Sequence, residues 1–413
     1  MLFDRTKEGD IEPDITKVQD RGEAVSEMEP LLIGARHRGK LTDLALELAL
    51  KAAGLRRSLP ENMQRALVDL VRVTNAYYSN LIDGHDTHPI DIERALKNDY
   101  SQDRHQRDLQ LEAKAHIAVQ EWIDLGGLQG RTASADGILE IHRRFCGLLP
   151  EDFLWIEDPQ TKERVRVVGG ETRKQDGLGG TQFAVGAGAL PRFMARFAEV
   201  YEAVNKTDSV LAAATAHHRL LWIHPFLDRN GRVARLVSHA MLLESLDTGA
   251  VWSVARGLAR SLEAYRRHLA ACDQPRRNDL DGRGQLSEEA LAAFAEFFFG
   301  ICIDQVDFME GLVQPDRLRA RIRGWAEEEI RLGKLPAKSE SILDSILQRG
   351  ELPRRDAASV VNASDRQARR IVSALLEQGV VTSESPREPL RLSFPPHLAA
   401  RWMPGLFPER KAS

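Results

Sequence analysis

One segment combines residue types that can act on a phosphate ester. It reads His-Pro-Phe-Leu-Asp-Arg-Asn-Gly-Arg-Val-Ala-Arg over residues 224–235. The imidazole of His224 can take a proton from an attacking hydroxyl near neutral pH. The carboxylate of Asp228 offers hard oxygen atoms that suit a Mg²⁺ ion bridging phosphates. Asn230 and Gly231 let the backbone approach an anion closely. The segment therefore indicates a site for chemistry at phosphorus.

Two arginines complete this candidate site. Arg232 and Arg235 are three residues apart, so a helix places them on one face, where they can clamp phosphate oxygens. The free amide groups and the positive dipole end at the start of that helix add to the anion site. Phe226 is expected to anchor the loop in the core. A base, a metal ligand and a phosphate clamp together predict transfer of a phosphorus-containing group by positioning and charge stabilisation.

The elements that must position these groups are helices. Residues 211–223 are strongly apolar and predict a buried helix, and residues 233–243 predict another. The candidate site is thus a loop between two core helices. Similar patterns run through most of the chain from Leu41 onwards, so we expect a mainly α protein.

Two β-like runs interrupt the helical pattern. Residues 165–170 and residues 183–186 are separated by glycine-rich sequence, which predicts one β-hairpin in an otherwise helical domain. An irregular loop is the alternative interpretation of the same residues.

The C-terminal part predicts a second kind of domain. After a linker near residues 332–338, three short helical patterns and two β-like runs follow in the order of a winged helix-turn-helix. The third helix carries Arg366, Arg369 and Arg370, which suit contacts to DNA phosphates. Residues 336–413 hold 12 Lys+Arg and 9 Asp+Glu, a modest excess of +3. A role in dimerisation or in docking a target protein therefore stays open beside DNA binding.

The composition bounds the remaining alternatives. The chain has 413 residues, with 57 Lys+Arg and 61 Asp+Glu, so its net charge of −4 supplies no field toward DNA or an anionic membrane. No apolar run approaches the roughly 20 residues of a membrane span. Three distant cysteines without a CxxC pair argue against a disulfide framework or a zinc site and fit the cytoplasm.

The chain is expected to have four parts. They are a polar tail (residues 1–33), N-terminal helices (34–125), a catalytic core (126–332) and the C-terminal domain (336–413).

The segment at residues 224–235 resembles the motif of Fic-domain proteins, His-Pro-Phe-x-Asp/Glu-Gly-Asn-Gly-Arg-x-x-Arg. The resemblance extends over roughly residues 40–395. It implies a Fic-type helical core with a hairpin flap, and transfer of AMP from ATP to a Ser, Thr or Tyr hydroxyl of a target protein, or of the enzyme itself. The resemblance also implies ATP and Mg²⁺ as cofactors and makes a homodimer an expectation.

The resemblance assigns roles to individual residues. His224 deprotonates the target hydroxyl, Asp228 holds Mg²⁺ on the α- and β-phosphates, and Arg235 orients the γ-phosphate. The expected ATP-binding residues are Phe226, Leu227, Asp228, Arg229, Asn230, Gly231, Arg232 and Arg235. The flap that pairs with an extended segment of the target by strand addition would use Val167, Val168, Val185 and Gly186. Ser261 and Tyr265 are candidates for the pocket of the nucleotide base.

Ser79-Asn80-Leu81-Ile82-Asp83-Gly84 resembles the inhibitory motif of the family, Ser/Thr-x-x-x-Glu-Gly/Asn. The resemblance predicts that Asp83 pairs with Arg235 at the end of a long helix, which Gly84 terminates. Because Asp is one methylene shorter than Glu, we expect a looser or water-bridged pair. The alternative is a helix-end carboxylate without that function.

The family has Gly where this chain has Arg229. If that position needs a positive φ, the arginine is strained there, and its side chain adds charge near the phosphates. Every side chain with a direct chemical role is nevertheless present, so we expect an active enzyme. Two alternatives remain. One is a nucleotide-sensing, DNA-binding regulator with an inactive site, and the other is an enzyme that removes AMP or transfers another nucleotide or a phosphate.

Overall fold

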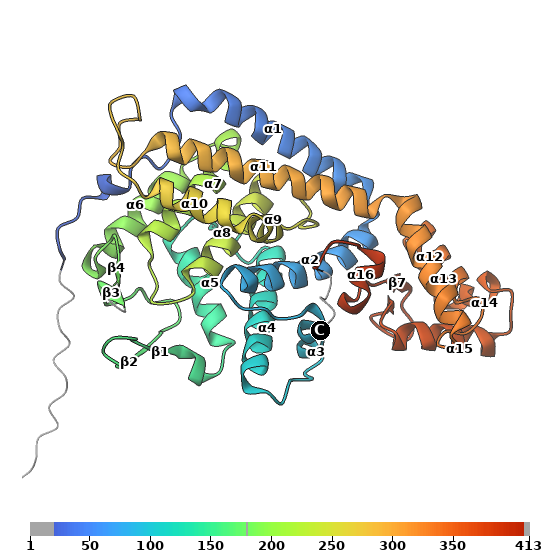
Figure 1. The fold of residues 1–413 in the computed structure, drawn as a ribbon. Coiled ribbons are helices and arrows are strands. Elements are labelled where there is room, and N and C mark those ends of the chain that lie inside the picture. The colour runs from blue at the N-terminus through green and yellow to red at the C-terminus, as the bar shows by residue number, and fades with distance from the viewer. Residues whose placement is uncertain (1–19, 179–180, 409–413) are drawn as a thin grey trace, which may run out of the picture.

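The computed structural model describes residues 20–178 and 181–408 and is mainly helical (Figure 1). Two long helices, α1 (Ala35–Ser58) and α11 (Glu288–Val313), lie side by side along one edge of the molecule. Leu41, Leu48 and Leu55 recur every seven residues on α1 and are all buried, because this spacing keeps them on one face of the helix.

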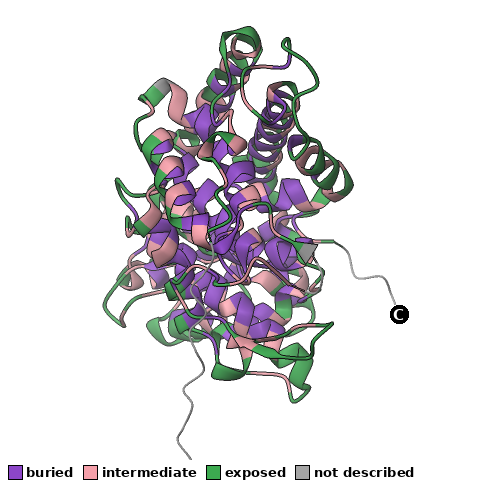
Figure 2. Cartoon of the chain, turned by 90° about the vertical axis from the view of Figure 1, so that its left-hand side faces the viewer, coloured by how far each residue is buried: buried purple, intermediate pink, exposed green. Residues whose placement is uncertain are grey.

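The remaining helices of the core surround the predicted loop. They are α2 (Glu61–Ile82), α3 (Pro89–Leu96), α4 (Arg104–Asp124), α5 (Ala135–Gly147), α6 (Leu190–Glu202), α7 (Lys206–Ile223), α8 (Asn230–Ser245), α9 (Val254–Arg260) and α10 (Leu262–Cys272). Helices α7 and α8 pack closely against each other, as expected for the two apolar segments that flank the loop. Buried residues run through the middle of the bundle, and exposed ones lie at its rim (Figure 2).

The β-structure differs from the prediction. Strand β1 (Trp155–Glu157) pairs antiparallel with β2 (Arg164–Arg166), and β3 (Gly177–Leu178) pairs antiparallel with β4 (Thr181–Gln182). The prediction of one hairpin joining residues 165–170 to residues 183–186 is therefore wrong. The two runs separate because the chain turns into the core between them, where the guanidinium of Arg173 donates to the carbonyl oxygen of Val185. Residues 179–180 of the glycine-rich sequence lie outside the described residues.

Part of the segment predicted as a polar tail, residues 1–33, packs against the core. Residues 1–19 lie outside the described part of the chain. A short 3₁₀ helix, η1 (Val25–Met28), follows, and the side chains of Met28 and Leu31 are buried against the core. The carbonyl oxygen of Pro30 accepts a hydrogen bond from Arg219, a fully buried arginine of α7. The apolar residues of this stretch show no helical period in the sequence, although Met28, Leu31 and Ile33 are buried against the bundle.

The C-terminal part holds the elements predicted there. Its helices are α12 (Pro315–Arg331), α13 (Ser339–Arg349), α14 (Ala357–Val360), α15 (Asp365–Glu377) and α16 (Ala399–Trp402). Strands β5 (Glu351–Leu352), β6 (Val381–Thr382) and β7 (Leu390–Leu392) form an antiparallel sheet in the order β5-β7-β6. Two 3₁₀ turns, η4 (Arg354–Asp356) and η5 (Pro396–Leu398), lie in this part. Two more, η2 (Glu151–Leu154) and η3 (Ala187–Ala189), lie in the core. The assignment of this part as a winged helix stays a prediction.

The C-terminal segment returns to the core. The hydroxyl of Tyr78 on α2 donates to the carbonyl oxygen of Leu406 at 2.8 Å, and the ring of Phe407 packs edge-on against Tyr77. Arg256 of α9 donates to the carbonyl oxygen of Gly405 at 2.8 Å. These contacts hold the end of the described chain against α2 and α9. Within the described ranges, no helix has the length and apolar character needed to span a lipid bilayer.

Candidate functional site

The loop between α7 and α8 is held in one conformation by its own side chains. The side-chain amide of Asn230 accepts from the backbone N–H of Phe226 at 3.0 Å and donates to the carbonyl oxygen of Phe226 at 2.8 Å. The ring of Phe226 is fully buried and stacks on the imidazole of His142, with ring centroids 3.9 Å apart. The expectation that Phe226 anchors the loop is confirmed.

His224 begins this loop as the residue that caps the C-terminal end of α7, in the left-handed region at φ 52°. The ring of Phe183 lies parallel to its imidazole, with centroids 4.7 Å apart, and Arg173 donates to its carbonyl oxygen at 2.8 Å. Burial, reinforced by the charge of Arg173, lowers the pKa of His224 to about 4. The imidazole is therefore neutral at pH 7, which is the form that accepts a proton.

At the other end of the loop, α8 starts with buried arginines. Arg235 donates to both carboxylate oxygens of Asp83, at 2.8 and 2.9 Å, and to the hydroxyl of Ser79 at 2.7 Å. The predicted contact between Asp83 and Arg235 is confirmed. The expectation of a looser or water-bridged pair is wrong, because α2 ends close enough for the shorter side chain to reach the arginine directly. Gly84 follows with φ 89°, a conformation that ends the helix and favours glycine.

Asp83 also holds the second arginine of the motif. Arg232 donates to Asp83 at 3.1 Å and to the carboxylate of Glu112 on α4 at 2.9 Å. Burial alone would raise the pKa of Glu112, but the hydrogen bond from His85 and the charge of Arg232 lower it to about 2. The hydrogen bond to Glu112 raises the pKa of His85 in turn. Two carboxylates thus neutralise the arginines at the start of α8.

Asp228 and Arg229 form a pair within the loop. Arg229 has φ 65°, so the condition under which strain was expected is met, and its side chain is buried. Its guanidinium donates to one carboxylate oxygen of Asp228 at 2.6 Å, and its backbone N–H donates to the other at 2.7 Å. The side chain of Asp228 remains 44% exposed.

The donor set at this point suits one kind of metal site. The described residues contain no cluster of three or more His, Cys, Asp or Glu side chains arranged to hold a metal ion. Mg²⁺ is commonly bound through one or two carboxylates together with substrate phosphates and water. The partly exposed carboxylate of Asp228 fits that mode, whereas no site made of protein ligands alone is present in the described part of the chain.

The remaining predicted residues are arranged differently from expectation. Val167 and Val185 are buried, and Val168 is exposed. The backbone N–H of Gly186 donates to the carboxylate of Glu23, from the segment that precedes α1. The assignment of these four residues to a target-docking flap stays a prediction.

The two residues predicted for the base pocket lie on or next to α10, in a closely packed part of the core. Tyr265 of α10 is buried, and its hydroxyl bonds to the imidazole of His217 at 2.6 Å. Burial raises the pKa of Tyr265 to about 12. Ser261 lies at the junction of α9 and α10, half-buried. Tyr265 therefore supports the packing of α7 against α10, and the assignment of Ser261 and Tyr265 to a base pocket stays a prediction.

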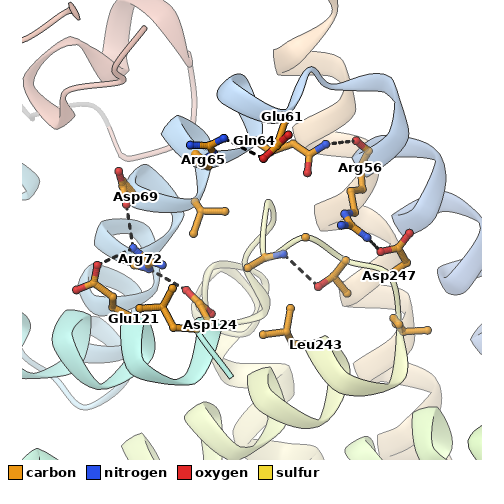
Figure 3. A pocket seen from close by; sticks show the side chains of 16 residues that line it. Arg56, Glu61, Gln64, Arg65, Asp69, Arg72, Glu121, Asp124, Leu243 and Asp247 are labelled. Atoms are coloured by element: carbon orange, nitrogen blue, oxygen red, sulfur yellow. Dashed lines mark hydrogen bonds and ion pairs between the residues drawn. The ribbon is translucent and has the colours of Figure 1, made fainter. Parts of the chain in front are cut away.

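A charged cleft lies away from the loop, between the N-terminal half of α2 and the C-terminal ends of α4 and α8 (Figure 3). Its volume is about 540 Å³. Arg72 lies on one side of the cleft and contacts Asp69, Glu121 and Asp124, with the closest contact, to Asp124, at 2.8 Å. The charges that line this cleft pair with one another, so the cleft shows no group prepared for a ligand.

Sequence reasoning missed three residues of the site. Glu112 lies on the buried face of α4, and an acidic residue at helical spacing from Leu109 and His116 was the signal that could have found it. Arg173 and Phe183 come from the segments around β3 and β4, and they contact His224 through the tertiary fold alone. No local pattern in the sequence marks that pair.

Comparison with known proteins found similarity to one family at this site. Residues 132–242 match the model of the Fic/DOC family, and the matched range includes the whole of residues 224–235. Over 127 residues the chain is 32% identical to protein adenylyltransferase Fic of Drosophila grimshawi, which covers 30% of this chain and 23% of that protein. Over 110 residues it is 36% identical to protein adenylyltransferase Fic of Drosophila mojavensis, covering 26% and 19%. The chain thus spans about a fifth of the length of these curated relatives.

Solved structures with related names were found as well. A Fic family protein from Desulfovibrio desulfuricans G20 aligns with 85% of this chain and 96% of its own, at 18% identity and a TM-score of 0.48. Fic-1 from C. elegans aligns with 68% of this chain and 76% of its own, at 16% identity and a TM-score of 0.49.

Proposed function

We propose that this protein transfers AMP from ATP to a Ser, Thr or Tyr hydroxyl of a target protein, or of itself, and releases pyrophosphate. The observation that carries the proposal is the loop at residues 224–235, which joins a neutral imidazole at one end to two buried arginines at a helix start. The match of residues 132–242 to the Fic/DOC family and the similarity to proteins named adenylyltransferase support the same reaction.

The residues divide the reaction between them. The hydroxyl oxygen of the target forms a bond to the α-phosphorus, the bond from that phosphorus to the pyrophosphate oxygen breaks, and His224 accepts the hydroxyl proton. The amides at the start of α8 and the guanidinium of Arg232 would hold phosphate oxygens, and Arg235 would orient the γ-phosphate. Because these donors are fixed by packing, they stabilise the developing charge with little rearrangement.

Asp228 would hold a Mg²⁺ ion, which would supply positive charge to neutralise the leaving pyrophosphate. The chain's own contribution there is the partly exposed carboxylate of Asp228.

We further propose that Asp83 inhibits the site. Its carboxylate contacts both Arg232 and Arg235, the two side chains that the reaction needs for phosphates. A triphosphate must therefore displace Asp83, or α2 must move, before the arginines can bind it. We call the contacts of Asp83 with these two arginines the brake.

Two labelled forms of ATP test the reaction type directly. The Asp83→Gly variant is incubated with ATP labelled at the α-phosphate or at the γ-phosphate, and label bound to protein is measured. AMP transfer predicts incorporation from the α position alone. Label from the γ position would instead establish phosphate transfer, and label from neither would remove the proposed reaction for this chain as its own acceptor.

A second candidate function is regulation through DNA. Arg366, Arg369 and Arg370 are exposed on α15, and the structure gives none of the three an ion pair with a described residue. Exposed cations on one helix suit phosphate contacts, although they carry no sequence information by themselves. Binding to duplex DNA that is lost in the triple glutamine variant, without any label transfer from ATP, would favour this regulator over the enzyme.

A further inference from the structure

Arg229 adopts a backbone conformation that an arginine normally avoids. Its φ of 65° and ψ of 14° lie in the left-handed region, where a residue with a β-carbon is strained and glycine is not. Such strain persists only where the surrounding structure enforces it, and it is often found at functional sites. The side chain of Arg229 is thus kept here at a cost in stability, and its contacts show what it does.

The guanidinium of Arg229 has three polar neighbours within the part of the chain that the structure describes, and Asp228 is the one in closest contact. One guanidinium nitrogen donates to Asp228 at 2.6 Å, and another donates to the carbonyl oxygen of Phe153 at 2.9 Å. The guanidinium also lies 4.0 Å from Glu112, and its side chain is only 4% exposed. The Nε atom is buried without a hydrogen-bond partner among the described residues. This packing fixes a positive charge beside the carboxylate that would hold the metal ion.

This pairing changes the charge balance of the phosphate site. The site holds three carboxylates and three guanidinium groups within direct contact, which are Asp83, Glu112, Asp228, Arg229, Arg232 and Arg235. With glycine in place of Arg229 the carboxylates would exceed the cations, and a bound triphosphate would depend on added Mg²⁺. With Arg229 the balance is even while the brake is closed, and it becomes positive when Asp83 moves away.

We propose that Arg229 is a built-in cation of the nucleotide site. It neutralises Asp228 and supplies part of the charge that Mg²⁺ would otherwise bring, so ATP binds with little dependence on Mg²⁺. This inference rests on the proposed function, because it assumes that the loop binds a triphosphate. It makes Arg229 a residue that sets the metal requirement, a role that glycine at this position cannot perform.

The first test measures ATP affinity by calorimetry on the full chain carrying Asp83→Gly, once with Mg²⁺ and once with EDTA. The same is done with Arg229→Gly and Arg229→Gln added. Glutamine keeps the β-carbon and the backbone strain, so the pair separates charge from strain. We expect EDTA to weaken binding less than about 3-fold in the parent and more than about 10-fold in both variants, since each loses a charge beside the phosphates.

The second test needs no nucleotide. Mn²⁺ binding followed by electron paramagnetic resonance should tighten at least about 5-fold in Arg229→Gln, because Asp228 is then no longer neutralised. Asp228→Asn added to that variant should remove the gain. Equal losses with EDTA in the parent and in the variants, or unchanged Mn²⁺ affinity, would overturn the role of Arg229 and leave the proposed function intact. No ATP binding in any variant under either condition would overturn the proposed function, and this inference with it.

Discussion

The molecule carries two sets of arginines at similar helical spacing in opposite environments. At the start of α8, Arg229, Arg232 and Arg235 are buried, and each contacts at least one carboxylate. On α15, Arg366, Arg369 and Arg370 are exposed, and the structure gives them no carboxylate partner among the described residues. Their spacing in the sequence does not show which set is buried and which is exposed.

The difference lies in what each set is prepared to do. A buried guanidinium requires compensation, so the carboxylates around α8 hold its arginines in fixed positions before any ligand arrives. Exposed arginines move freely in water and gain order only on binding. The α8 set therefore suits catalysis, which needs preorganised charge, and the α15 set suits an electrostatic surface.

The largest effect should come from removing the base beside the α8 set. In the Asp83→Gly background, His224→Ala should lower transfer by roughly 10²–10⁴-fold, because the attacking hydroxyl loses its proton acceptor. ATP affinity, measured by calorimetry, should stay within about 3-fold, since phosphate contacts do not use the imidazole. Transfer that persists at the parent rate would exclude His224 as the base.

A second substitution separates buried from exposed charge. Glu112→Ala leaves Arg232 with one carboxylate fewer in a buried place, and we expect a loss of about 3 kcal/mol in the free energy of unfolding, measured with urea. Glu121→Ala is the matched control on the same helix, because Glu121 is half exposed and lies 3.4 Å from Arg72. It should cost less than about 1 kcal/mol. Equal costs for both would contradict the special role of the buried pair.

The pH dependence of transfer tests the environment of His224. Because burial lowers the pKa of this imidazole to about 4, the neutral base persists at pH 5 and is lost only as the pH falls through about 4. Rates at pH 5 and pH 7 should then agree within about 2-fold. An ordinary imidazole with a pKa near 6.5 would lose roughly 25-fold of its neutral form between pH 7 and pH 5. A rate that falls through pH 6.5 would show that the base is not shielded as described.

The smallest effect should come from the α15 set. Changing Arg366, Arg369 and Arg370 together to glutamine should alter the free energy of unfolding by less than about 0.5 kcal/mol, because exposed residues without partners add little. Transfer by the Asp83→Gly variant should be unchanged. A lower rate of transfer in this triple variant would mean that α15 takes part in the site.

Sequence patterns predicted what depends on local order. The helices on either side of the loop follow from apolar periodicity, and the glycine that the family has at position 229 raised the question of a positive φ there. The contact between Asp83 and Arg235 was predicted as well, because a motif with a known partner marks it. These features depend on residue spacing within one segment, or on a family motif whose partner residue is known.

Features that depend on distant segments could not be predicted. Glu112 reaches Arg232 from another helix, and Phe183 covers His224 from a different loop. The strands β3 and β4 are two residues each, too short to show an alternating pattern, so their pairing was assigned to the wrong runs. The burial of Tyr265 against His217 likewise depends on packing between distant helices, which the sequence does not show.

Intact-mass spectrometry tests most directly whether Asp83 restrains a competent transferase. The full chain, Asp83→Gly, Asp83→Asn and Asp83→Gly/His224→Ala are each incubated with ATP and Mg²⁺. We predict a mass gain of one adenylyl group in the two single variants, at least about 10-fold above the parent chain, because both free Arg232 and Arg235 from a charged partner. The double variant should gain none. Equal modification of the parent and the single variants would contradict the restraint, and a gain that survives His224→Ala would contradict the site.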